Sequence, residues 1–407
     1  MYLQLAWRNI WRNPRRTIVI MTAVVIGVWA MIFLGALMRG VSAQMVKNGI
    51  ATLTGHIQIH QRGFRNDPVI ENSMHEPEMV EALLAEYLPS DARWSPRVRV
   101  DAIANNARHS GGLTLVGIDP EREAGVSFIG QAVVKGEYLD AGDEYGIIVG
   151  QALVDKFETK LGRKLVFMSQ DTERDIASRA FRIRGVFRAE MEATEKQYAF
   201  ITKGAAQKML KLGAGISEIS ILLADYEDAE SVADNLKEVI PPDSYEVETW
   251  RELLPLVTAV LKMYDWFIYI WYLVIFIAMG FGIVNTILMA VFERIREFGL
   301  FRALGMKPLW IVKEVLTESF FLLTLGMIIG SGLGLLSIHA LADTGIDLSA
   351  LSEGLEFVGM SRVIYPVIII RDIVVANLVV LVLGIAVSAY PAIKAARFTP
   401  VEAMART

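Results

Sequence analysis

The stretch TIVIMTAVVIGVWAMIFLGALM, residues 17–38, contains no charged side chain between Arg16 and Arg39. About 20 apolar residues suffice to cross a membrane as a helix, because each adds about 1.5 Å and the hydrocarbon core is roughly 30 Å thick. The stretch is too long for the apolar core of a signal peptide, and no small-residue cleavage site follows it. We therefore predict a retained membrane-spanning helix.

Three further apolar stretches, nearly free of charge, follow at residues 266–292, 314–342 and 372–393. Residues 39–262 between the first and second stretches instead have the mixed, charged composition of a soluble domain. The overall hydrophobic content of 53% is too high for an entirely soluble chain of 407 residues. The predicted fold class is an α-helical membrane protein with four transmembrane helices and a large α+β domain inserted between helices 1 and 2.

Lysine and arginine predict the orientation, because they are enriched in cytoplasmic segments. They gather in residues 1–16, 293–313 and 394–407, which we expect to be cytoplasmic together with both termini. The connection 343–371 is richer in acidic residues and is expected to be periplasmic, like the large domain. Trp7 and Trp11 alternate with arginines at helical spacing, so residues 1–16 are predicted to form an interfacial elbow helix.

The domain at 39–262 alternates short strand-like runs, such as GHIQIHQ and GGLTLVGID, with helical ones, such as EPEMVEALLAEYLP. Residues 40–53 and 250–264, which join it to the spans, contain one strong helix breaker, Pro255. We therefore expect helical connections, which fit both a stiff lever and a simple tether.

Several classes of site are excluded or disfavoured by residue content. The chain has no cysteine, a net charge of -5 and no GxxxxGK[ST] loop, which argues against thiolate chemistry, nucleic-acid binding and ATP binding by this chain. Ionisable groups are scarce in the spans, which disfavours an ion-driven carrier. His56 and His60 fall on one face of a predicted strand, which we interpret as a solvated face and not a metal site. His339 is expected at the membrane interface. We predict no catalytic residue and no metal ligand.

Gly326, Gly330 and Gly334 recur every four residues in the third span. Such spacing leaves one helix face bare enough for another helix to approach closely. Packing within the four-helix unit and dimerisation explain the pattern equally well.

The loop after the second span, FERIREFGLFRALGMKP at residues 292–308, mixes charged and apolar residues at helical spacing. This pattern predicts a short amphipathic cytoplasmic helix that ends at Gly305. Such a helix can be a handle for a partner protein or can lie on the membrane surface.

This loop resembles the E-R-x-R-E-x-G-x-x-R-A-L-G signature of the FtsX/MacB-like, or type VII, ABC transporter permeases. The matching residues are Glu293, Arg294, Arg296, Glu297, Gly299, Arg302, Ala303, Leu304 and Gly305. The C-terminal segment YPAIKAARFTPVEAMAR, residues 390–406, is similar to the closing motif of the same family, with Met404 for the usual leucine. The opening LTGHIQIHQRGF looks most like the lipoprotein-releasing permeases of the Lol type.

The resemblance implies a non-catalytic permease subunit in the bacterial inner membrane that works by mechanotransmission. A separate ATPase dimer would bind ATP and Mg²⁺ and grip the signature helix, and a second permease, identical or paralogous, would complete the complex. Extraction of lipoproteins or another amphiphile from the outer leaflet is the expected function. Delivery of periplasmic substrates to an outer-membrane duct and FtsX-like signalling to cell-wall hydrolases are the alternatives.

In the carrier-binding Lol permease a long hook loop projects from a periplasmic hairpin. The corresponding segment here, residues 168–181, is shorter, charged and free of proline. It therefore stays a possible contact for a periplasmic lipoprotein carrier or adaptor, or marks a subunit without a hook. The candidate contact residues are Met168, Gln170, Asp171, Arg174, Arg179 and Phe181.

Overall fold

The computed structural model describes residues 8–9, 11–347 and 363–398. Parts of the predicted elbow helix, of the connection 343–371 and of the C-terminal motif lie outside these ranges. The described residues form two compact units. We call residues 45–259 the sheet unit. The helical unit comprises the described residues up to Gln44 and from Val260 onward.

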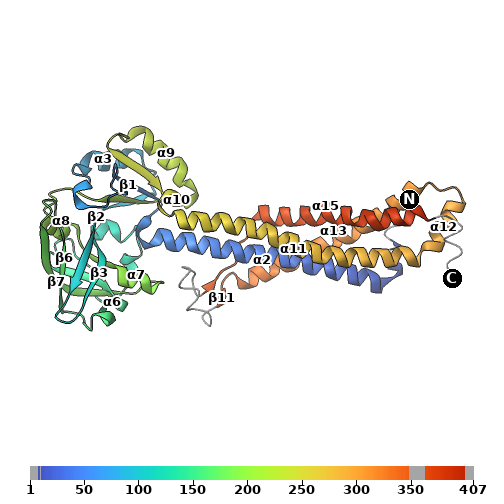
Figure 1. The fold of residues 1–407 in the computed structure, drawn as a ribbon, viewed down its shortest axis with the longest axis horizontal. Helices are drawn as coiled ribbons and strands as arrows, with labels where there is room; N and C mark the ends of the chain where they lie inside the picture. Colours follow the sequence, from blue (N-terminus) through green and yellow to red (C-terminus); the bar gives the residue numbers. More distant parts are fainter. Residues whose placement is uncertain (1–7, 10, 348–362, 399–407) are drawn as a thin grey trace. The chain divides into compact units, whose positions relative to one another are not determined.

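The helical unit is built around four helices that are long and apolar enough to cross a membrane (Figure 1). Three of the four predicted spans lie within them, and the span predicted at 314–342 extends one residue beyond its helix, which ends at Leu341. The helices are α2 (Pro14–Gly49), α11 (Pro255–Glu293), α13 (Pro308–Leu341) and α15 (Ile370–Arg397). A shorter helix, α12 (Ile295–Ala303), lies between α11 and α13, and strands β11 (Ile346–Asp347) and β12 (Val363–Ile364) pair after α13.

Helices α2 and α11 are longer than a membrane requires. They contain 36 and 39 residues, which correspond to about 54 Å and about 58 Å at 1.5 Å per residue. The hydrocarbon core is roughly 30 Å thick. Helix α2 runs on past Gln44, and α11 begins before Val260, so both connections to the sheet unit are helical.

The glycines of α13 lie against α2. A Cβ atom added to Gly326 would come within 2.6 Å of the Val24 side chain, and one on Gly334 within 3.0 Å of Ile32. At Gly330 the added atom would lie 2.8 Å from the carbonyl oxygen of Val25. Gly332, on another face of the same helix, has nothing within 4 Å of this position. The glycine spacing therefore serves packing within this chain.

This contrast predicts opposite effects for two alanine substitutions. Gly332→Ala should stabilise the protein by up to about 1 kcal/mol, because alanine favours a helix over glycine. Gly330→Ala should destabilise it by about 1–3 kcal/mol, because the methyl group meets a backbone atom that cannot turn away. Unfolding midpoints of the purified variants in mixed detergent micelles measure both. Equal midpoints for the two variants would contradict the close packing of α2 and α13.

Arg39 ties three helices of this unit together. Its Nε atom donates to Asp372 of α15 at 2.6 Å, and its Nη1 atom donates to Asp265 of α11. Nearby, the backbone N–H of Val367 donates to the carbonyl oxygen of Ala36 at 3.0 Å. We call Arg39, Asp265 and Asp372 the Arg39 triad.

The sheet unit is an α+β domain, as predicted. Its strands are β1 (Ile57–Gln61), β2 (Arg93–Asn105), β3 (Ser110–Ile118), β4 (Val133–Gly136), β5 (Gly146–Gly150), β6 (Lys164–Gln170), β7 (Ile176–Phe187), β8 (Tyr198–Thr202), β9 (Glu218–Leu222) and β10 (Tyr245–Thr249). Its helices are η1 (Ile50–Thr54), η2 (Ile70–Asn72), α3 (Pro77–Tyr87), α4 (Pro120–Glu123), α5 (Ile129–Ala132), α6 (Gln151–Lys156), α7 (Glu192–Gln197), α8 (Lys203–Leu210), η3 (Tyr226–Asp228), α9 (Ala229–Val239) and α10 (Trp250–Leu253).

The strands pair in the order β10-β1-β9-β2-β3-β8-β5-β7-β4, and β6 pairs with both β2 and β7. Strands β2, β3, β8, β5, β7 and β6 therefore form a closed ring of pairings. The long strand β2 belongs to this ring through Ile103 and its neighbours, and to the open part of the sheet through residues 93–97, which pair with β9. Closing a sheet in this way removes exposed strand edges.

The prediction of a solvated histidine face on β1 is wrong. His56 and His60 are 7% and 4% exposed. The backbone N–H of Leu223 donates to His56 Nδ1 at 3.0 Å, and the ring of Phe64 stacks on His60. Burial disfavours the imidazolium form and lowers the pKa of His56, and attraction by the Asp225 carboxylate offsets only part of this effect. The alternating pattern of a strand identifies which side chains share one face of the sheet. It does not reveal whether other segments of the chain cover that face.

Candidate functional site

Helix α12, which carries the predicted signature, is defined by its two ends. Arg294 leaves the helical conformation of α11, with φ -103° and ψ 11°. Gly305 has φ +87°, a conformation that glycine adopts readily. The N–H groups of Gly305 and Met306 donate to the carbonyl oxygens of Arg302 and Phe301, which is a Schellman ending. Both turns hold α12 as a separate helix between two long ones.

Opposite faces of α12 have different surroundings. Ile295 and Phe298 are buried, and Phe298 belongs to the core of the helical unit. Arg296, Leu300 and Leu304 follow each other at four-residue spacing and are exposed. The exposed fractions of Leu300 and Leu304 are 55% and 77%. Exposed leucines on a well-anchored helix are typical of a surface that another protein covers.

The anchor of α12 is an ion-pair cluster around Arg294. Its guanidinium donates to Glu297 of α12 at 2.9 Å, to Glu314 at 2.7 Å and to Glu318 at 2.8 Å, the last two in α13. Arg294 is 7% exposed and Glu318 is 6% exposed. Charge-assisted hydrogen bonds are stronger than hydrogen bonds between neutral groups. A guanidinium group carries five N–H donors, so Arg294 can bind all three carboxylates at once.

The N-terminal residues complete this cluster. Asn9 Nδ2 donates to Glu314 at 3.0 Å and to Glu318 at 2.8 Å, and Arg12 Nη2 donates to Glu297 at 2.6 Å. We call the described set the Arg294 cluster. It consists of Asn9, Arg12, Arg16, Arg294, Glu297, Glu314 and Glu318.

The cluster is balanced in charge, with three arginines and three glutamates, so its members can remain ionised. Burial raises the pKa of Glu297, but the hydrogen bonds from Arg294 and Arg12 outweigh this effect and leave that pKa below its usual value. The N-terminal segment and the ends of α11, α12 and α13 are thereby connected through side chains. A displacement of α12 must therefore move or break contacts with all of these segments.

The predicted signature residues separate into two groups. Arg294 and Glu297 belong to the cluster, Glu293 accepts a hydrogen bond from Asn13 at 3.3 Å, and Gly299 is buried. Arg296, Ala303, Leu304 and Gly305 are exposed, as is Glu293, while Arg302 is half-buried. Sequence reasoning missed Asn9, Leu300, Glu314 and Glu318. Two glutamates four residues apart at the start of an apolar helix were a signal for the last pair.

The segment predicted as a loop at residues 168–181 is largely strand. Strand β6 ends at Gln170 and β7 begins at Ile176, because buried and exposed side chains alternate there. Phe181 is fully buried, and Arg179 is half-buried against the ring of Tyr145. The turn is thus confined to residues 171–175.

This turn is fastened to the body of the sheet unit. Asp171 accepts from the backbone N–H groups of Glu173 and Asp175 and from Lys211 Nζ, the last at 2.9 Å. Lys211 also pairs with Glu173. Arg174, with Nε 3.1 Å from Glu71, has an 80% exposed side chain. A hairpin end held in this way does not project as a hook.

Comparison with protein families matches both parts of the chain. Residues 17–239 match the MacB-like periplasmic core domain, and residues 269–400 match the FtsX-like permease C-terminal domain. The first match alone covers more than half of the 407 residues.

Two curated proteins and one solved structure are similar to this chain over different shares of its length. The lipoprotein-releasing system transmembrane protein LolC of Xylella fastidiosa is 24% identical over 397 residues, which cover 94% of this chain and 91% of that protein. The macrolide export ATP-binding/permease protein MacB of an Azoarcus species is 28% identical over 218 residues, or 53% of this chain and 28% of that protein. The crystal structure of the periplasmic region of MacB from Actinobacillus actinomycetemcomitans aligns with a TM-score of 0.36 and 14% identity, covering 52% of this chain and 97% of that chain.

The order of elements agrees with these matches, since one long helix precedes the inserted domain and three follow it. The chain therefore belongs to the FtsX/MacB-like family of ABC transporter permeases.

Proposed function

We propose that this permease subunit transmits the closure of a separate ATPase dimer to its inserted domain. The observation that carries the proposal is the pair of faces on α12. One face exposes Leu300 and Leu304, and the other is fixed to neighbouring helices by the Arg294 cluster. A partner that binds the exposed face can therefore pull on α11 and α13 directly.

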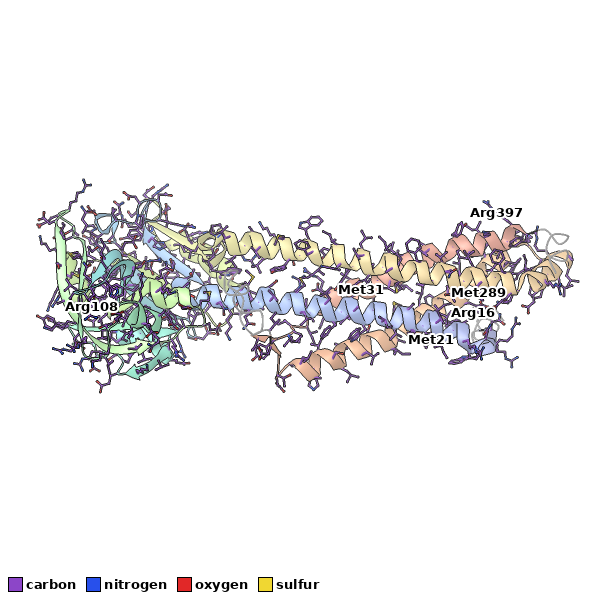
Figure 2. All side chains as sticks on the ribbon, turned by 60° about the horizontal axis from the view of Figure 1, so that its bottom comes forward. Arg16, Met21, Met31, Arg108, Met289 and Arg397 are labelled. Atoms are coloured by element: carbon purple, nitrogen blue, oxygen red, sulfur yellow. The ribbon has the colours of Figure 1, made fainter. Side chains whose placement is uncertain are left out.

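The orientation follows from the distribution of basic residues. Arg16 and Arg397 lie towards the same end of the helical unit, with Met31 farther along α2 (Figure 2). Lysine and arginine favour the cytoplasmic side. We therefore place α12 and both termini in the cytoplasm and the inserted domain in the periplasm of the bacterial inner membrane. ATP and Mg²⁺ would then bind to the cytoplasmic partner, since this chain has no P-loop sequence.

We propose that the transmitted motion extracts lipoproteins or another amphiphile from the outer leaflet of the inner membrane. This choice is supported by the similarity to a lipoprotein-releasing protein over 94% of the chain. Transport of an amphiphile from the outer leaflet needs no polar pathway through the membrane, which agrees with the apolar character of the four long helices. A second permease, identical or paralogous, would complete the complex.

Affinity purification of the chain from native membranes in mild detergent, followed by mass spectrometry of bound proteins and lipids, tests this proposal. We expect a P-loop ATPase, a second permease and acylated lipoproteins. An ATPase bound together with a periplasmic adaptor would instead indicate efflux, and a bound cell-wall hydrolase would indicate signalling. Recovery of the intact chain without any ATPase would overturn the proposal.

A further inference from the structure

Arg97 holds the end of the first connecting segment. Its side chain is fully buried, and its Nη1 atom donates to the carbonyl oxygen of Leu53. Leu53 lies in η1, which directly continues helix α2. Carbonyl groups at a helix C-terminus carry partial negative charge, so a cation there is stabilising. Arg97 also pairs with Glu123, at 3.0 Å and 2.8 Å.

Arg65 holds the second connecting segment in a similar way. Its Nη2 atom lies 2.6 Å from the carbonyl oxygen of Glu252 and 3.4 Å from that of Leu253. These residues end α10, immediately before α11 begins at Pro255. The other nitrogen of the guanidinium, Nη1, donates to Glu248 at 2.6 Å. Each connection to the membrane helices is thus capped by an arginine of the sheet unit.

Three side chains join these two arginines. Glu218 accepts from Arg97 at 3.3 Å, and its second oxygen lies 3.9 Å from Nε2 of His60. The other ring nitrogen, Nδ1 of His60, lies 3.8 Å from Glu248. We call the series Arg97, Glu218, His60, Glu248 and Arg65 the relay. It runs across neighbouring strands, because β1 pairs with both β9 and β10.

The middle of the relay is its loosest part. Both contacts of His60 exceed hydrogen-bond length, and its Nδ1 atom and one oxygen of Glu248 are buried without a hydrogen-bond partner. His60 also lines a recess, partly open to solvent, whose walls include Leu53 and Leu254 from the two connecting segments. A small shift of either segment can therefore close or open these contacts.

The negative charge of Glu218 is stable. Burial raises the pKa of Glu218, but attraction by His60, Arg99 and Arg97 outweighs it and lowers this pKa to about 2. Glu218 therefore stays ionised over the whole physiological range. Its negative charge remains available to Arg97 on one side and to His60 on the other.

From this geometry we propose that the relay couples the two connecting segments, with His60 as the adjustable link, so that displacement of η1 is passed to the start of α11 through the sheet unit. The five residues are positioning residues and touch no substrate. The biological role of this coupling rests on the proposed function. The coupling itself is a property of this chain and can be measured without an ATPase.

Spin labels on the two segments provide the test. The chain has no cysteine, so Lys47→Cys in α2 and Leu256→Cys in α11, both exposed, can be labelled in the otherwise unchanged full-length protein. Double electron–electron resonance in lipid nanodiscs then gives the distribution of distances between them. We expect one narrow distribution with the intact relay. His60→Gln and Arg65→Gln should each broaden it and shift its mean.

Arg62→Gln is the matched control. Arg62 belongs to the same loop as Arg65, but it donates to the carbonyl oxygen of Pro242 at 2.9 Å and lies outside the relay. The control should keep the narrow distribution. Broadening in the control, or an unchanged distribution in both relay variants, would overturn the inference.

Two further measurements separate coupling from folding and from the proposed function. Circular dichroism identifies a variant that is unfolded, and Arg65→Gln, at a half-exposed position, decides the result where His60→Gln does not fold. Arg65→Lys keeps the charge but cannot reach two carbonyl groups and a carboxylate together, so it should give intermediate broadening. A failure to recover an ATPase would refute the proposed function and leave these distances unaffected.

Discussion

Replacing Leu300 and Leu304 together with glutamate is expected to abolish capture of the partner ATPase by this chain. Both side chains are exposed on the α12 face that is not used for internal packing. Central apolar contacts of an interface commonly contribute about 2 kcal/mol or more each. Loss of both therefore corresponds to a weakening of roughly a thousandfold, which co-purification from membranes at fixed expression level would register as complete loss.

Ile176→Glu is the control for this experiment. Ile176 is 82% exposed and belongs to the sheet unit, which the ATPase is not expected to reach. The control should retain the ATPase at the level of the unmodified chain. Capture by the double variant at the same level as the control would refute α12 as the docking surface.

Charge reversal at Arg296 and Glu297 tests the same surface but affects docking and the anchoring of α12 together. Glu297 accepts hydrogen bonds from Arg294 at 2.9 Å and from Arg12 at 2.6 Å. Reversal would therefore disrupt the Arg294 cluster as well as any docking contact. We expect it to abolish ATPase association, but only the leucine pair separates docking from anchoring.

Arg97→Met should destabilise the sheet unit by about 3–5 kcal/mol, because removing one member of a buried ion pair leaves uncompensated charge. The carboxylates left behind would be those of Glu123 and Glu218, which are 0% and 2% exposed. The carbonyl group of Leu53 would also lose one of its two donors and keep Gln58 Nε2 at 3.2 Å. Thermal or denaturant unfolding of the full-length protein, followed by circular dichroism, measures the effect.

An exposed ion pair provides the comparison for Arg97. Arg108, labelled in Figure 2, lies 3.3 Å from Glu158, and these side chains are 77% and 61% exposed. Arg108→Met should change stability by no more than about 1 kcal/mol. Similar losses for Arg97→Met and Arg108→Met would contradict the role given to burial.

The low pKa of Glu218 sets a pH window for the same interaction. A carboxyl group with a lowered pKa in the folded state contributes stability above its unfolded pKa. For Glu218 the contribution is complete above the ordinary value of 4.5 and is lost as the pH falls towards about 2. Unfolding midpoints measured between pH 6 and 2 should therefore fall in the unmodified protein, and this part of the fall should be missing in Glu218→Gln.

Sequence patterns were sufficient for the parts of this fold that depend on local composition. The four spans follow from long apolar stretches with few charged residues, and α12 follows from its amphipathic spacing and the glycine at its end. The Arg294 cluster could not be predicted in this way. Its contacts join residues as far apart as Asn9 and Glu318, and charges at the ends of spans usually suggest only topology.

The surroundings of individual side chains were the other feature that the sequence did not predict. The charged segment 168–181 predicts a possible contact for a carrier or adaptor, but its composition does not reveal that Lys211 binds Asp171 and Glu173 and fastens the turn to the sheet unit. His60 was expected in water and is instead enclosed by Phe64, Glu218 and Glu248. In both cases the deciding partner comes from a distant segment, and a local pattern does not reveal it.

The Arg39 triad also bears on how this protein is synthesised. Its members lie in the first, the second and the last of the four long helices, so they leave the ribosome far apart in time. Until α15 has been inserted, Arg39 has only Asp265 as a carboxylate partner within the triad. Completion of the triad thus has to wait for the insertion of α15, and a truncated product that lacks α15 keeps Arg39 paired with Asp265 alone.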